Sequence, residues 1–508
     1  MTNLLNTIYM KKLMLLTICA AILSVIMPAS AQTNKYLLKI IPQPVECNLS
    51  PSYYVPFTQL TIYTDDTEAV AWAEKHLAQW YKKEAPKVFQ KSYTGKSTKS
   101  GAYSININSN GVVICAKELE GVRYALYSLR QIAIPERNTL KVEGWIVPVG
   151  AINDYPTMKF RGMHICWFPE TEEFEIERMI RMAAYYKLNY VVLEPWGTYR
   201  SKVAPWLNWD EAPITKKSIK RLVAIAKELG VTIIPQLNIF GHASQSRSRS
   251  AKHSAIDQRP CYQPLFEPMA GWNWCLSNPK AKEVIEAVMV EMLEDFGNPE
   301  FFHIGCDEAQ QPSCPECLKQ PYSKLFVEHI KFAHDVLAKH GARAMMWQDM
   351  LLEKGDKRWT DYKANGTAET AKAAEEMPKD IVICDWHYRA GRKDYPSYSY
   401  FKELGYDLLA CPWKNVSGIV AEARAIENIG AFGMLGTIWH HYYGYDIASI
   451  YTNIAGATWN PSANFAQHNG FNLFKTHQRH ISWDMKLKKY YQFGIQNYQI
   501  PDNKATYK

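Results

Sequence analysis

The stretch KKSIKRLVAIAKELGVTIIPQLNIF, residues 216–240, joins a helical pattern to a strand pattern. Gly230 stands where the C-terminal cap of the helix belongs, and the β-rich run VTIIPQLNIF follows directly. Four apolar residues share one face at helical spacing: Ile219, Leu222, Val223 and Ala226. A chain that repeats such a unit builds a parallel sheet covered by helices.

The same alternation of strand and helix runs from residue 160 onward. Eight β-type runs are each followed by a plausible helix: FRGMHIC, NYVVLEP, VTIIPQLNIF, FFHIGCDE, ARAMMWQDM, IVICDWHY, YDLLACPW and FGMLGTIWH. Eight such units are the number that closes a TIM barrel. The predicted fold class is therefore α/β, with a (β/α)8 barrel over residues 157–480.

The residues on either side of the barrel follow other patterns. Residues 38–150 combine short strand-like runs such as YSININ with the helical stretch EAVAWAEKHLAQWYKK, which predicts a small α+β accessory domain. The Pro-marked segment GAINDYPTMKFRG, residues 150–162, forms the boundary. Residues 481–508 are expected to be a C-terminal tail.

The first 31 residues have the pattern of a secretory signal peptide. Lys11 and Lys12 precede an apolar stretch, and the small residues 29–31 (Ala-Ser-Ala) predict cleavage after Ala31. The chain is then periplasmic or secreted, with no membrane span after cleavage. A retained membrane anchor and a lipoprotein acylated at Cys19 are the alternatives.

The distribution of charged residues and of cysteines limits which partners and which covalent links the chain can have. Removing residues 1–31 takes away two lysines, so the formal charge falls from +8 to +6, and the remaining basic residues are scattered. This pattern argues against a nucleic-acid partner. Ten widely spaced cysteines remain, which suits buried apolar residues better than a disulfide framework. Cys314 and Cys317 form a CxxC pair, which is compatible with zinc, redox chemistry, a loop staple or free thiols.

The active site of a TIM barrel lies at the C-terminal ends of the strands, and those ends are rich in tryptophan here. Six of the eight have one nearby: Trp167, Trp196, Trp347, Trp386, Trp413 and Trp439. Aromatic faces pack against sugar rings, and polar groups at the same ends can bind hydroxyls. The candidates for this polar role are Glu194, His242 and His441. The pattern predicts a carbohydrate-binding site.

Two adjacent acids, Asp307 and Glu308, end the fourth strand run, FFHIGCDE. A glycosidase usually brackets the scissile bond with two carboxylates several ångströms apart, which sequence neighbours cannot easily do. They can act together if the nucleophile is the 2-acetamido oxygen of the substrate. One carboxylate then orients the acetamide while the other protonates the leaving group. Mutual repulsion also helps to keep one of them protonated.

These motifs resemble family 20 of the glycoside hydrolases, the exo-acting β-N-acetylhexosaminidases. HIGCDE is similar to the family signature His-x-Gly-x-Asp-Glu, with Cys306 where the commonest members have glycine. IIPQPVE and GVRYALYSLRQI resemble the accessory domain of the family, and DYPTMKFRG resembles its entry into the barrel. The resemblance covers nearly the whole mature chain.

The resemblance implies a role for each matched residue. Asp307 orients the acetamide and Glu308 is the general acid and later the base. Arg161 matches an arginine that holds the outer hydroxyls of the bound sugar, His242 matches a histidine near the site, and His303 is a supporting group. Tyr388 is the candidate donor to the acetamide oxygen. The aromatic box around the sugar is assigned to Trp347, Trp386, Trp413 and Trp439.

The chain also departs from the common family pattern. The usual Pro-Glu-(Ile/Leu)-Asp before the Gly-His-Ala motif reads Pro235-Gln236-Leu237-Asn238, and His441 occupies the place of an acid that binds outer hydroxyls. Glu194 stands near the place of an absent HxxDD-like stretch. A less acidic pocket could admit 6-sulfated or 6-phosphorylated sugars, so the preferred sugar stays open.

Three other interpretations of the acidic pair remain. His303, Asp307 and Glu308 are potential ligands of a metal-dependent hydrolase. The scaffold could serve a glycan-binding protein without activity, or Asp307 could form a structural salt bridge with a barrel arginine. The favoured prediction names no metal ligand and no cofactor, and its partner is a glycan with a terminal N-acetylhexosamine.

Overall fold

The structure is a computed structural model that describes most of the chain after residue 39. The described ranges are residues 40–138, 141–208, 214–244, 259–268, 271–359, 364–389, 394–439, 445–461, 477, 479–481 and 484–485. All of them belong to one compact unit, Tyr36–Lys508. The predicted signal peptide and His441 lie outside the described residues.

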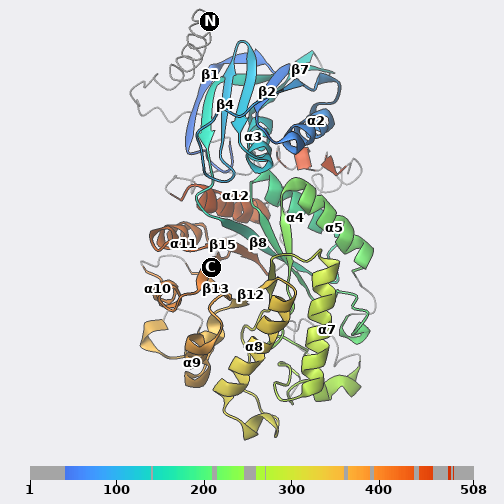
Figure 1. The fold of residues 1–508 in the computed structure, drawn as a ribbon, viewed down its shortest axis with the longest axis vertical. Helices are drawn as coiled ribbons and strands as arrows, with labels where there is room; N and C mark the ends of the chain where they lie inside the picture. Colours follow the sequence, from blue (N-terminus) through green and yellow to red (C-terminus); the bar gives the residue numbers. More distant parts are fainter. Residues whose placement is uncertain are drawn as a thin grey trace, which may run out of the picture. The chain divides into compact units, whose positions relative to one another are not determined.

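The N-terminal domain is a seven-stranded sheet with two helices on one face (Figure 1). The sheet order is β1-β7-β4-β5-β2-β3, with β6 paired to β7. Its strands are β1 (Glu46–Pro56), β2 (Gln59–Tyr63), β3 (Lys87–Lys91), β4 (Tyr103–Asn108), β5 (Gly111–Ala116), β6 (Ile134–Asn138) and β7 (Lys141–Asp154). Buried residues alternate along β4 and β5, as expected for a sheet with one covered face.

The two helices of this domain are α2 (Thr67–Tyr81) and α3 (Leu119–Ile132). Only α2 is expected from the helical stretch in the sequence, and it begins where Asp66 accepts a hydrogen bond from the backbone N–H of Ala69. The second helix, α3, buries ten of its fourteen residues, among them the polar Ser128 and Arg130.

The second domain is a closed barrel of eight parallel strands, which confirms the predicted fold class. The strands pair in the order β10-β9-β8-β15-β14-β13-β12-β11, and a parallel bridge between Gln236 and His303 joins the two ends. The strands are β8 (Phe160–Trp167), β9 (Tyr190–Pro195), β10 (Thr232–Pro235), β11 (Phe301–His303), β12 (Arg343–Trp347), β13 (Val382–His387), β14 (Asp407–Pro412) and β15 (Gly433–Ile438).

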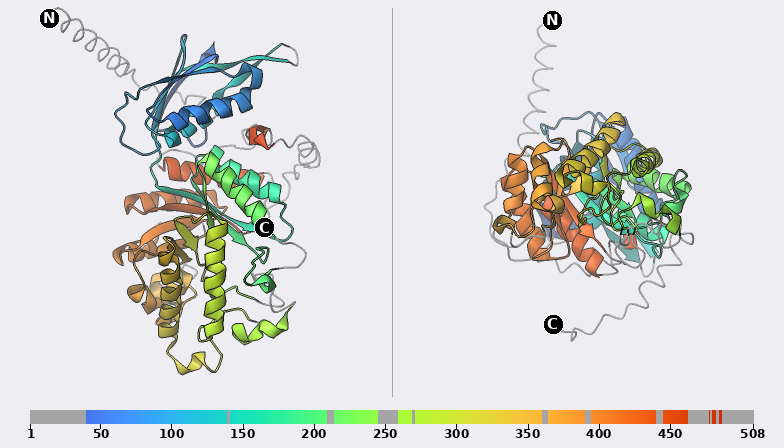
Figure 2. Two further views of the ribbon diagram at one scale, coloured as in Figure 1. Left: turned by 45° about the vertical axis from the view of Figure 1, so that its right-hand side comes forward. Right: turned by 90° about the horizontal axis from the view of Figure 1, so that it is seen from below.

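Within the described residues an α-helix follows each barrel strand, and together these helices surround the strands (Figure 2, right). They are α4 (Glu173–Tyr185), α5 (Lys216–Leu229), α7 (Pro279–Asp295), α8 (Tyr322–Lys339), α9 (Ala368–Glu376), α10 (Pro396–Glu403), α11 (Val416–Asn428) and α12 (Tyr445–Trp459). In α5, Thr215 caps the start, and Gly230 ends the helix in the left-handed conformation with φ of 80°. Among the described residues, the helices lack the combination of length and apolar content that a bilayer span requires.

A buried polar cluster joins the two domains at the N-terminal end of the barrel. Asp154, at the end of β7, accepts hydrogen bonds from Tyr103 (2.5 Å), Lys187 (3.1 Å) and the indole of Trp459 (2.7 Å). Lys187 is fully buried and forms an ion pair with this carboxylate. These contacts tie the two domains together, and removal of either charged partner would leave an uncompensated buried charge.

The described residues near the C-terminus also contact the N-terminal domain. Asp484 forms an ion pair of 2.7 Å with Arg130 of α3, and His480 lies 2.9 Å from the hydroxyl of Tyr185 in α4. Ile481 is buried. The start of the segment expected to be a tail therefore packs between α3 and α4.

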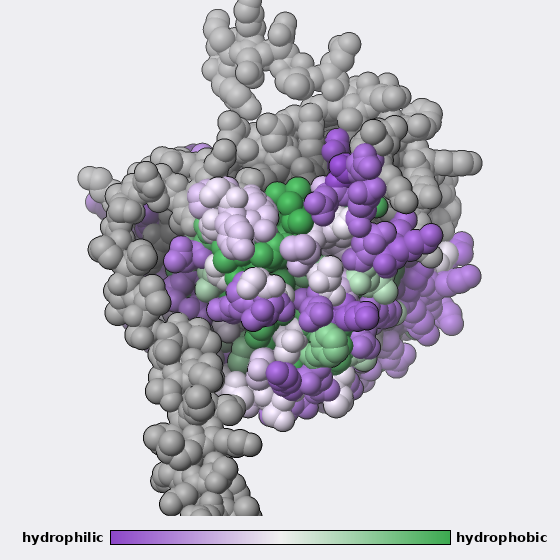
Figure 3. All heavy atoms as spheres, turned by 90° about the horizontal axis from the view of Figure 1, so that it is seen from above, coloured by the Kyte–Doolittle hydropathy of each residue, from purple (hydrophilic) through white to green (hydrophobic). Residues whose placement is uncertain are grey.

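The outer face of the N-terminal domain mixes hydrophilic and hydrophobic residues (Figure 3). The large exposed apolar side chains among the described residues of the domain are Tyr53 on β1, Phe89 on β3 and Ile134 on β6. Apolar residues exposed singly are normal on protein surfaces. The residues that carry chemistry are at the ends of the barrel strands.

Candidate active site

A tight turn after β11 sends the two adjacent acids in different directions. Gly305, Cys306 and Glu308 all have positive φ, at 67°, 75° and 46°. A Cβ atom at Gly305 would collide with the side chain of Asn238, so glycine is required there. Asp307 is 7% exposed, whereas the side chain of Glu308 is 44% exposed. Neighbours in sequence therefore occupy different environments.

Asp307 is held in place by two side chains from the segment after β10. The amide Nδ2 of Asn238 donates to its Oδ1 at 3.0 Å, and Nε2 of His242 lies 3.2 Å from its Oδ2. His242 itself has φ of 55° and is 5% exposed. Both carboxylate oxygens have a defined partner, so the orientation of Asp307 is set before any ligand binds.

Glu308 is anchored through its backbone, and its side chain reaches outward. Its N–H donates to Oδ2 of Asp349 at 2.8 Å, and its carbonyl accepts from the indole of Trp272 at 2.8 Å. One carboxylate oxygen of Glu308 lies 3.4 Å from Nε2 of His242. A fixed backbone with an accessible carboxyl group suits a general acid.

Asp349 is a component of the site that the sequence places at the end of a strand run without assigning it a role. It follows β12, is fully buried, and accepts hydrogen bonds from the Glu308 N–H and from Nδ2 of Asn365 (2.8 Å). Burial, with the negative charge of Asp307 next in size, raises the pKa of Asp349 from 3.8 to about 7. Three carboxyl groups thus meet around one turn, and at least one of them favours the protonated form.

Glu194 is linked to Asp307 through two amides instead of facing solvent. Nε2 of Gln236 donates to Oε1 of Glu194 at 2.6 Å and to Oδ1 of Asn238 at 3.0 Å, and Asn238 in turn donates to Asp307. The indole of Trp196 donates to the other oxygen of Glu194. Amides at positions 236 and 238 can donate to both neighbouring carboxylates, whereas acids there would add charge between them.

The predicted aromatic residues form one connected group. The rings of Trp347 and Trp439 are 5.5 Å apart, and those of Trp386 and Tyr388 are stacked at 5.2 Å. Trp413 meets Tyr388 edge-on at 5.5 Å. Trp347 and Trp386 are buried, while the other three are half-buried. The half-buried rings are the ones that retain surface for a ligand.

Tyr388 occupies a central place in this aromatic group. Its hydroxyl oxygen accepts a hydrogen bond of 2.7 Å from the indole of Trp439. Burial raises the pKa of Tyr388 well above its ordinary value. The phenol therefore stays protonated and has an O–H to donate. The negative charge of Asp307 also raises the pKa of this phenol, which shows that Tyr388 lies near the acidic pair.

Two histidines connect the aromatic group to the acidic residues. The ring of His164 lies 4.5 Å from that of Trp439, and its Nε2 is 3.3 Å from a carboxylate oxygen of Glu194. The ring of His303 lies 4.4 Å from that of Trp347, and its Nδ1 accepts the N–H of Gly305 at 3.0 Å. His303 thus supports the turn that carries Asp307, in the position expected of a supporting group.

The structure corrects the expectation for Arg161. This residue is second in β8, at the N-terminal end of the barrel, and is 2% exposed. Its guanidinium donates to the backbone carbonyl of Lys187 (3.0 Å), that of Met158 (2.8 Å) and the hydroxyl of Tyr124 (2.5 Å). The C-terminal end of β8 lies six residues further on, about 20 Å away at the rise of a strand. Arg161 joins the two domains and does not reach the acidic pair.

The remaining metal-based interpretation finds little support in the geometry. Among the described residues, two groups of His, Cys, Asp or Glu are close enough to share an ion, and neither includes Asp307 or Glu308. One is His164, Cys166 and Glu194, behind the aromatic group. The other is Glu267, Cys275, Cys314 and Cys317.

Trp272 is the second residue that sequence reasoning missed. It lies in the segment between β10 and α7, its ring is 4.3 Å from that of His242 and tilted by 53°, and its indole donates to the carbonyl of Glu308. Asp349 was visible at a strand end, but its burial and its contact with Glu308 were not. Nothing local in the sequence marks Trp272, because its contacts are made between loops.

The chain is a (β/α)8 barrel protein with paired carboxylates and aromatic residues at its strand ends, and comparison with known proteins gives the family. Residues 152–416 match "Glycosyl hydrolase family 20, catalytic domain", and residues 37–155 match "Glycosyl hydrolase family 20, domain 2". The chain belongs to glycosyl hydrolase family 20.

Relatives with a curated description share about a quarter of their residues with the chain. A beta-hexosaminidase of Porphyromonas gingivalis is 26% identical over 326 residues, covering 57% of this chain and 41% of that protein. A beta-hexosaminidase of Vibrio furnissii is 23% identical over 372 residues, covering 65% of this chain and 56% of that protein. The chain thus spans about half the length of these relatives.

Solved structures share the fold. An exo beta-N-acetylglucosaminidase from Vibrio harveyi, in complex with N-acetylglucosamine, aligns with a TM-score of 0.67 and 18% identity, covering 90% of this chain and 79% of that one. A beta-N-acetylhexosaminidase from Bacteroides fragilis aligns with a TM-score of 0.64 and 17% identity, covering 91% and 96%.

Proposed function

We propose that this protein is an exo-acting β-N-acetylhexosaminidase that uses the acetamido group of its substrate as the nucleophile. The observation that carries the proposal is the unequal pair at the end of β11. Asp307 is buried and bonded by Asn238, while Glu308 is anchored by its backbone and exposes its carboxyl group. The relatives named above, beta-hexosaminidases and an N-acetylglucosaminidase, support the same substrate class.

In the first step the acetamido oxygen attacks C1 of the terminal sugar, and the bond from C1 to the leaving oxygen breaks. Glu308 gives its proton to that oxygen. Asp307 accepts the acetamide N–H and stabilises the positive charge that spreads over the cyclised oxazoline ring. Tyr388 donates to the acetamide oxygen and holds it in line with C1.

In the second step the roles at Glu308 reverse. Its carboxylate takes a proton from water, the water oxygen attacks C1, and the C1–O bond of the oxazoline breaks to regenerate the acetamide. Two displacements at C1 leave the anomeric configuration unchanged, so the enzyme is retaining. His242, within 3.4 Å of both acids, orients them through this cycle.

The proposal is tested with aryl β-glycosides that carry or lack the 2-acetamido group, assayed with wild type and Glu308→Gln. We expect hydrolysis of the 2-acetamido substrate only. Glu308→Gln should lose about 10²- to 10⁴-fold in kcat with a poor leaving group, because general acid catalysis is worth that much, and much less with a highly acidic phenol. Glu68→Gln, on the exposed first turn of α2, is the matched control and should retain full activity.

The same assay separates the rival functions. Glycan binding with no turnover of any substrate would indicate a binding protein on this scaffold. Activity that still disappears with a chelator and returns with a divalent ion when Cys314, outside the acidic pair, is replaced by serine would favour a metal-dependent hydrolase. Equal rates for the 2-hydroxy and 2-acetamido substrates would refute substrate assistance.

Substitution of the usual acids by Gln236, Asn238 and His441 motivates a finer proposal about the sugar. A pocket with fewer acids repels an anionic substituent less, so the enzyme should accept 6-sulfated or 6-phosphorylated N-acetylglucosaminides. Comparison of kcat/KM for plain and 6-sulfated aryl N-acetylglucosaminides tests this. Turnover of the plain sugar alone would refute the proposal that the enzyme accepts 6-substituted sugars.

We also propose that the enzyme is exported and acts in the periplasm or outside the cell. The signal-like pattern of residues 1–31 supports this. Mass spectrometry of the protein from an expressing cell should find a mature N-terminus at Gln32. An intact N-terminus on soluble cytoplasmic protein would contradict the proposal.

A further inference from the structure

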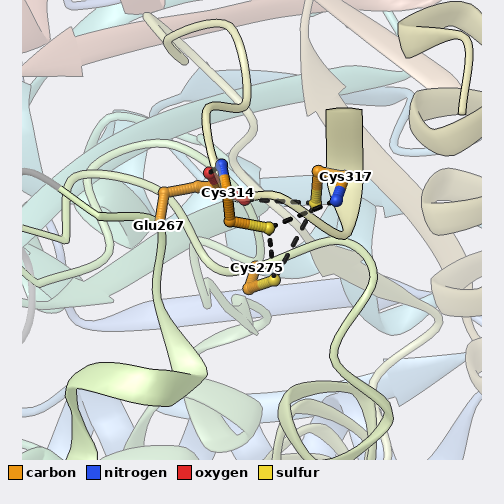
Figure 4. A group of neighbouring side chains, drawn as sticks. All are labelled: Glu267, Cys275, Cys314 and Cys317. Carbon is orange, nitrogen blue, oxygen red and sulfur yellow. Dashed lines mark hydrogen bonds between the residues drawn. The ribbon is translucent and has the colours of Figure 1, made fainter. Parts of the chain in front are cut away.

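Three cysteines and a glutamate meet beside the active-site loops without a role in the reaction proposed above. Cys314 and Cys317 are the CxxC pair in the loop after β11, and Cys275 and Glu267 come from the segment between β10 and α7 (Figure 4). All four side chains are buried, with 2% to 9% exposure. We call them the Cys3Glu cluster.

The distances within the Cys3Glu cluster are those of a coordination shell. Sγ of Cys275 lies 3.6 Å from Sγ of Cys314 and 3.8 Å from Sγ of Cys317. A zinc–thiolate bond of about 2.3 Å gives a sulfur–sulfur edge of about 3.8 Å in a regular tetrahedron. A disulfide would need about 2.05 Å, and all three cysteines are free thiols in the structure.

Glu267 supplies the fourth corner of the tetrahedron. Its Oε1 lies 3.2 Å from Sγ of Cys317, while its Oε2 accepts the backbone N–H groups of Ser313 (2.7 Å) and Cys314 (2.8 Å). One oxygen is thus fixed by the backbone and the other faces the thiols. All four ligand atoms lie within 4.8 Å of one another.

The backbone around the cluster is shaped to support ligands. The N–H of Cys317 donates to Sγ of Cys314 at 3.3 Å, a bond that stabilises a thiolate. On the other side, an antiparallel bridge between Phe266 and Trp274 forms a short hairpin that carries both Glu267 and Cys275. Such outer bonds are what hold metal ligands in one orientation.

We propose that the Cys3Glu cluster binds one divalent zinc ion in a closed tetrahedral site. Three thiolates and a carboxylate suit zinc, whose structural sites are four-coordinate with sulfur and nitrogen or oxygen ligands. Binding replaces the proton of each of the three thiols, and three thiolates, one carboxylate and a doubly charged cation sum to a net charge of −2. With four protein ligands no position stays open for substrate, and the ion has a structural role.

This role connects the cluster to the acidic pair. The hairpin that carries Cys275 also carries Trp272 and Asn273, which bond the carbonyls of Glu308 (2.8 Å) and Gln310 (2.6 Å). Asn273 also accepts the N–H of Gln310 at 3.1 Å. An ion that ties this hairpin to the CxxC loop would therefore set the backbone position of Glu308 from outside the reacting centre.

The site is tested on the full mature chain, by metal content first. Protein purified under reducing conditions with added zinc should retain about one zinc per chain after dialysis, and cobalt substitution should produce thiolate-to-cobalt charge-transfer absorption. Cys275→Ser, Cys314→Ser and Cys317→Ser should each lose the ion and the absorption. Cys261→Ser is the matched control, since Cys261 is an exposed cysteine of the neighbouring Pro260–Leu265 turn, and should change neither.

A second measurement uses the wild type alone, so it tests the site even if the cysteine variants do not fold. Bound zinc should protect Cys275, Cys314 and Cys317 from alkylation in the folded protein, and removal of zinc by a chelator should expose them together. Two results would overturn the proposal: a wild type with no more zinc than Cys314→Ser, or a Cys314–Cys317 or Cys275–Cys314 disulfide that persists in reduced, zinc-supplemented protein. Both readouts are independent of glycosidase activity, so the site and the proposed function fail separately.

Discussion

Replacement of Asp349 by asparagine should make the protein more stable, and increasingly so as the pH rises. Burial and the charge of Asp307 raise the pKa of Asp349 from 3.8 to about 7. Both of its side-chain hydrogen bonds, from the Glu308 N–H and from Asn365, end on the same oxygen Oδ2. One amide oxygen can accept both of these bonds, so Asp349→Asn removes the ionisation and keeps the contacts.

The size of the effect follows from linkage between protonation and folding. One pKa unit corresponds to about 1.36 kcal/mol, so the raised pKa represents about 4 kcal/mol in full. Between pH 4 and pH 7 the unfolded chain has released this proton and the folded chain retains it, so the free energy of unfolding falls by about 1.4 kcal/mol per pH unit. Asparagine has no such dependence. The stability difference between variant and wild type should therefore grow by about 3 kcal/mol from pH 5 to pH 8.

Urea unfolding of the two proteins at several pH values, followed by tryptophan fluorescence, measures this difference. Titrating groups distant from Asp349 are common to both proteins and cancel in the comparison. Asp65→Asn, at an exposed position of the N-terminal domain, is the matched control for removal of one carboxylate. A flat difference for Asp349→Asn, or one that shrinks as the pH rises, would show that the carboxyl group is ionised in the folded protein at low pH.

Three further substitutions test individual contacts. Asn238→Ala removes the donor to Asp307 and should lower kcat about 10- to 100-fold, the cost of one hydrogen bond to a buried charge; an unchanged kcat would mean that Asp307 needs no orientation. Arg161→Met should reduce the free energy of unfolding by about 3–5 kcal/mol and leave KM unchanged in the folded fraction. If Arg161→Met instead raises KM and unfolds at wild-type stability, Arg161 contacts the substrate. Tyr388→Phe should lower kcat at least tenfold by loss of the donated hydrogen bond, with an equal melting temperature, and full activity would assign the acetamide contact elsewhere.

The barrel could be predicted from the sequence because its units are local. The apolar face of α5 and the cap at Gly230 are set by residues within one turn of each other, and the strand after them is buried on both faces. Since the active site of such a barrel lies at the strand ends, the positions of Asp307 and Tyr388 followed from strand direction alone.

Arg161 was assigned to the site by resemblance alone, and strand geometry would have excluded it. Its motif matched the family, but its place as the second residue of β8 already puts it at the end of the barrel opposite the acids. The direction of the strand, applied as it was for Asp307, predicts the location that the structure shows.

Contacts between loops could not be predicted in the same way. Trp272 lies 36 residues from Glu308 in sequence, and Cys275 lies 39 residues from Cys314. Each pair meets because two loops follow neighbouring strands of the barrel. The raised pKa of Asp349 likewise depends on burial and on Asp307, neither of which a local pattern encodes.

The central claim is that the acetamido oxygen of the substrate is the nucleophile, held by Asp307 while Glu308 moves the proton. It is tested most directly by kcat/KM for aryl glycosides whose N-acetyl group carries zero to three fluorine atoms. Each fluorine makes the amide oxygen a poorer nucleophile, so we predict a steep fall along the series, with the wild-type enzyme and one aryl leaving group throughout. A rate that does not change with fluorination would contradict the account and assign the nucleophile to the protein or to water.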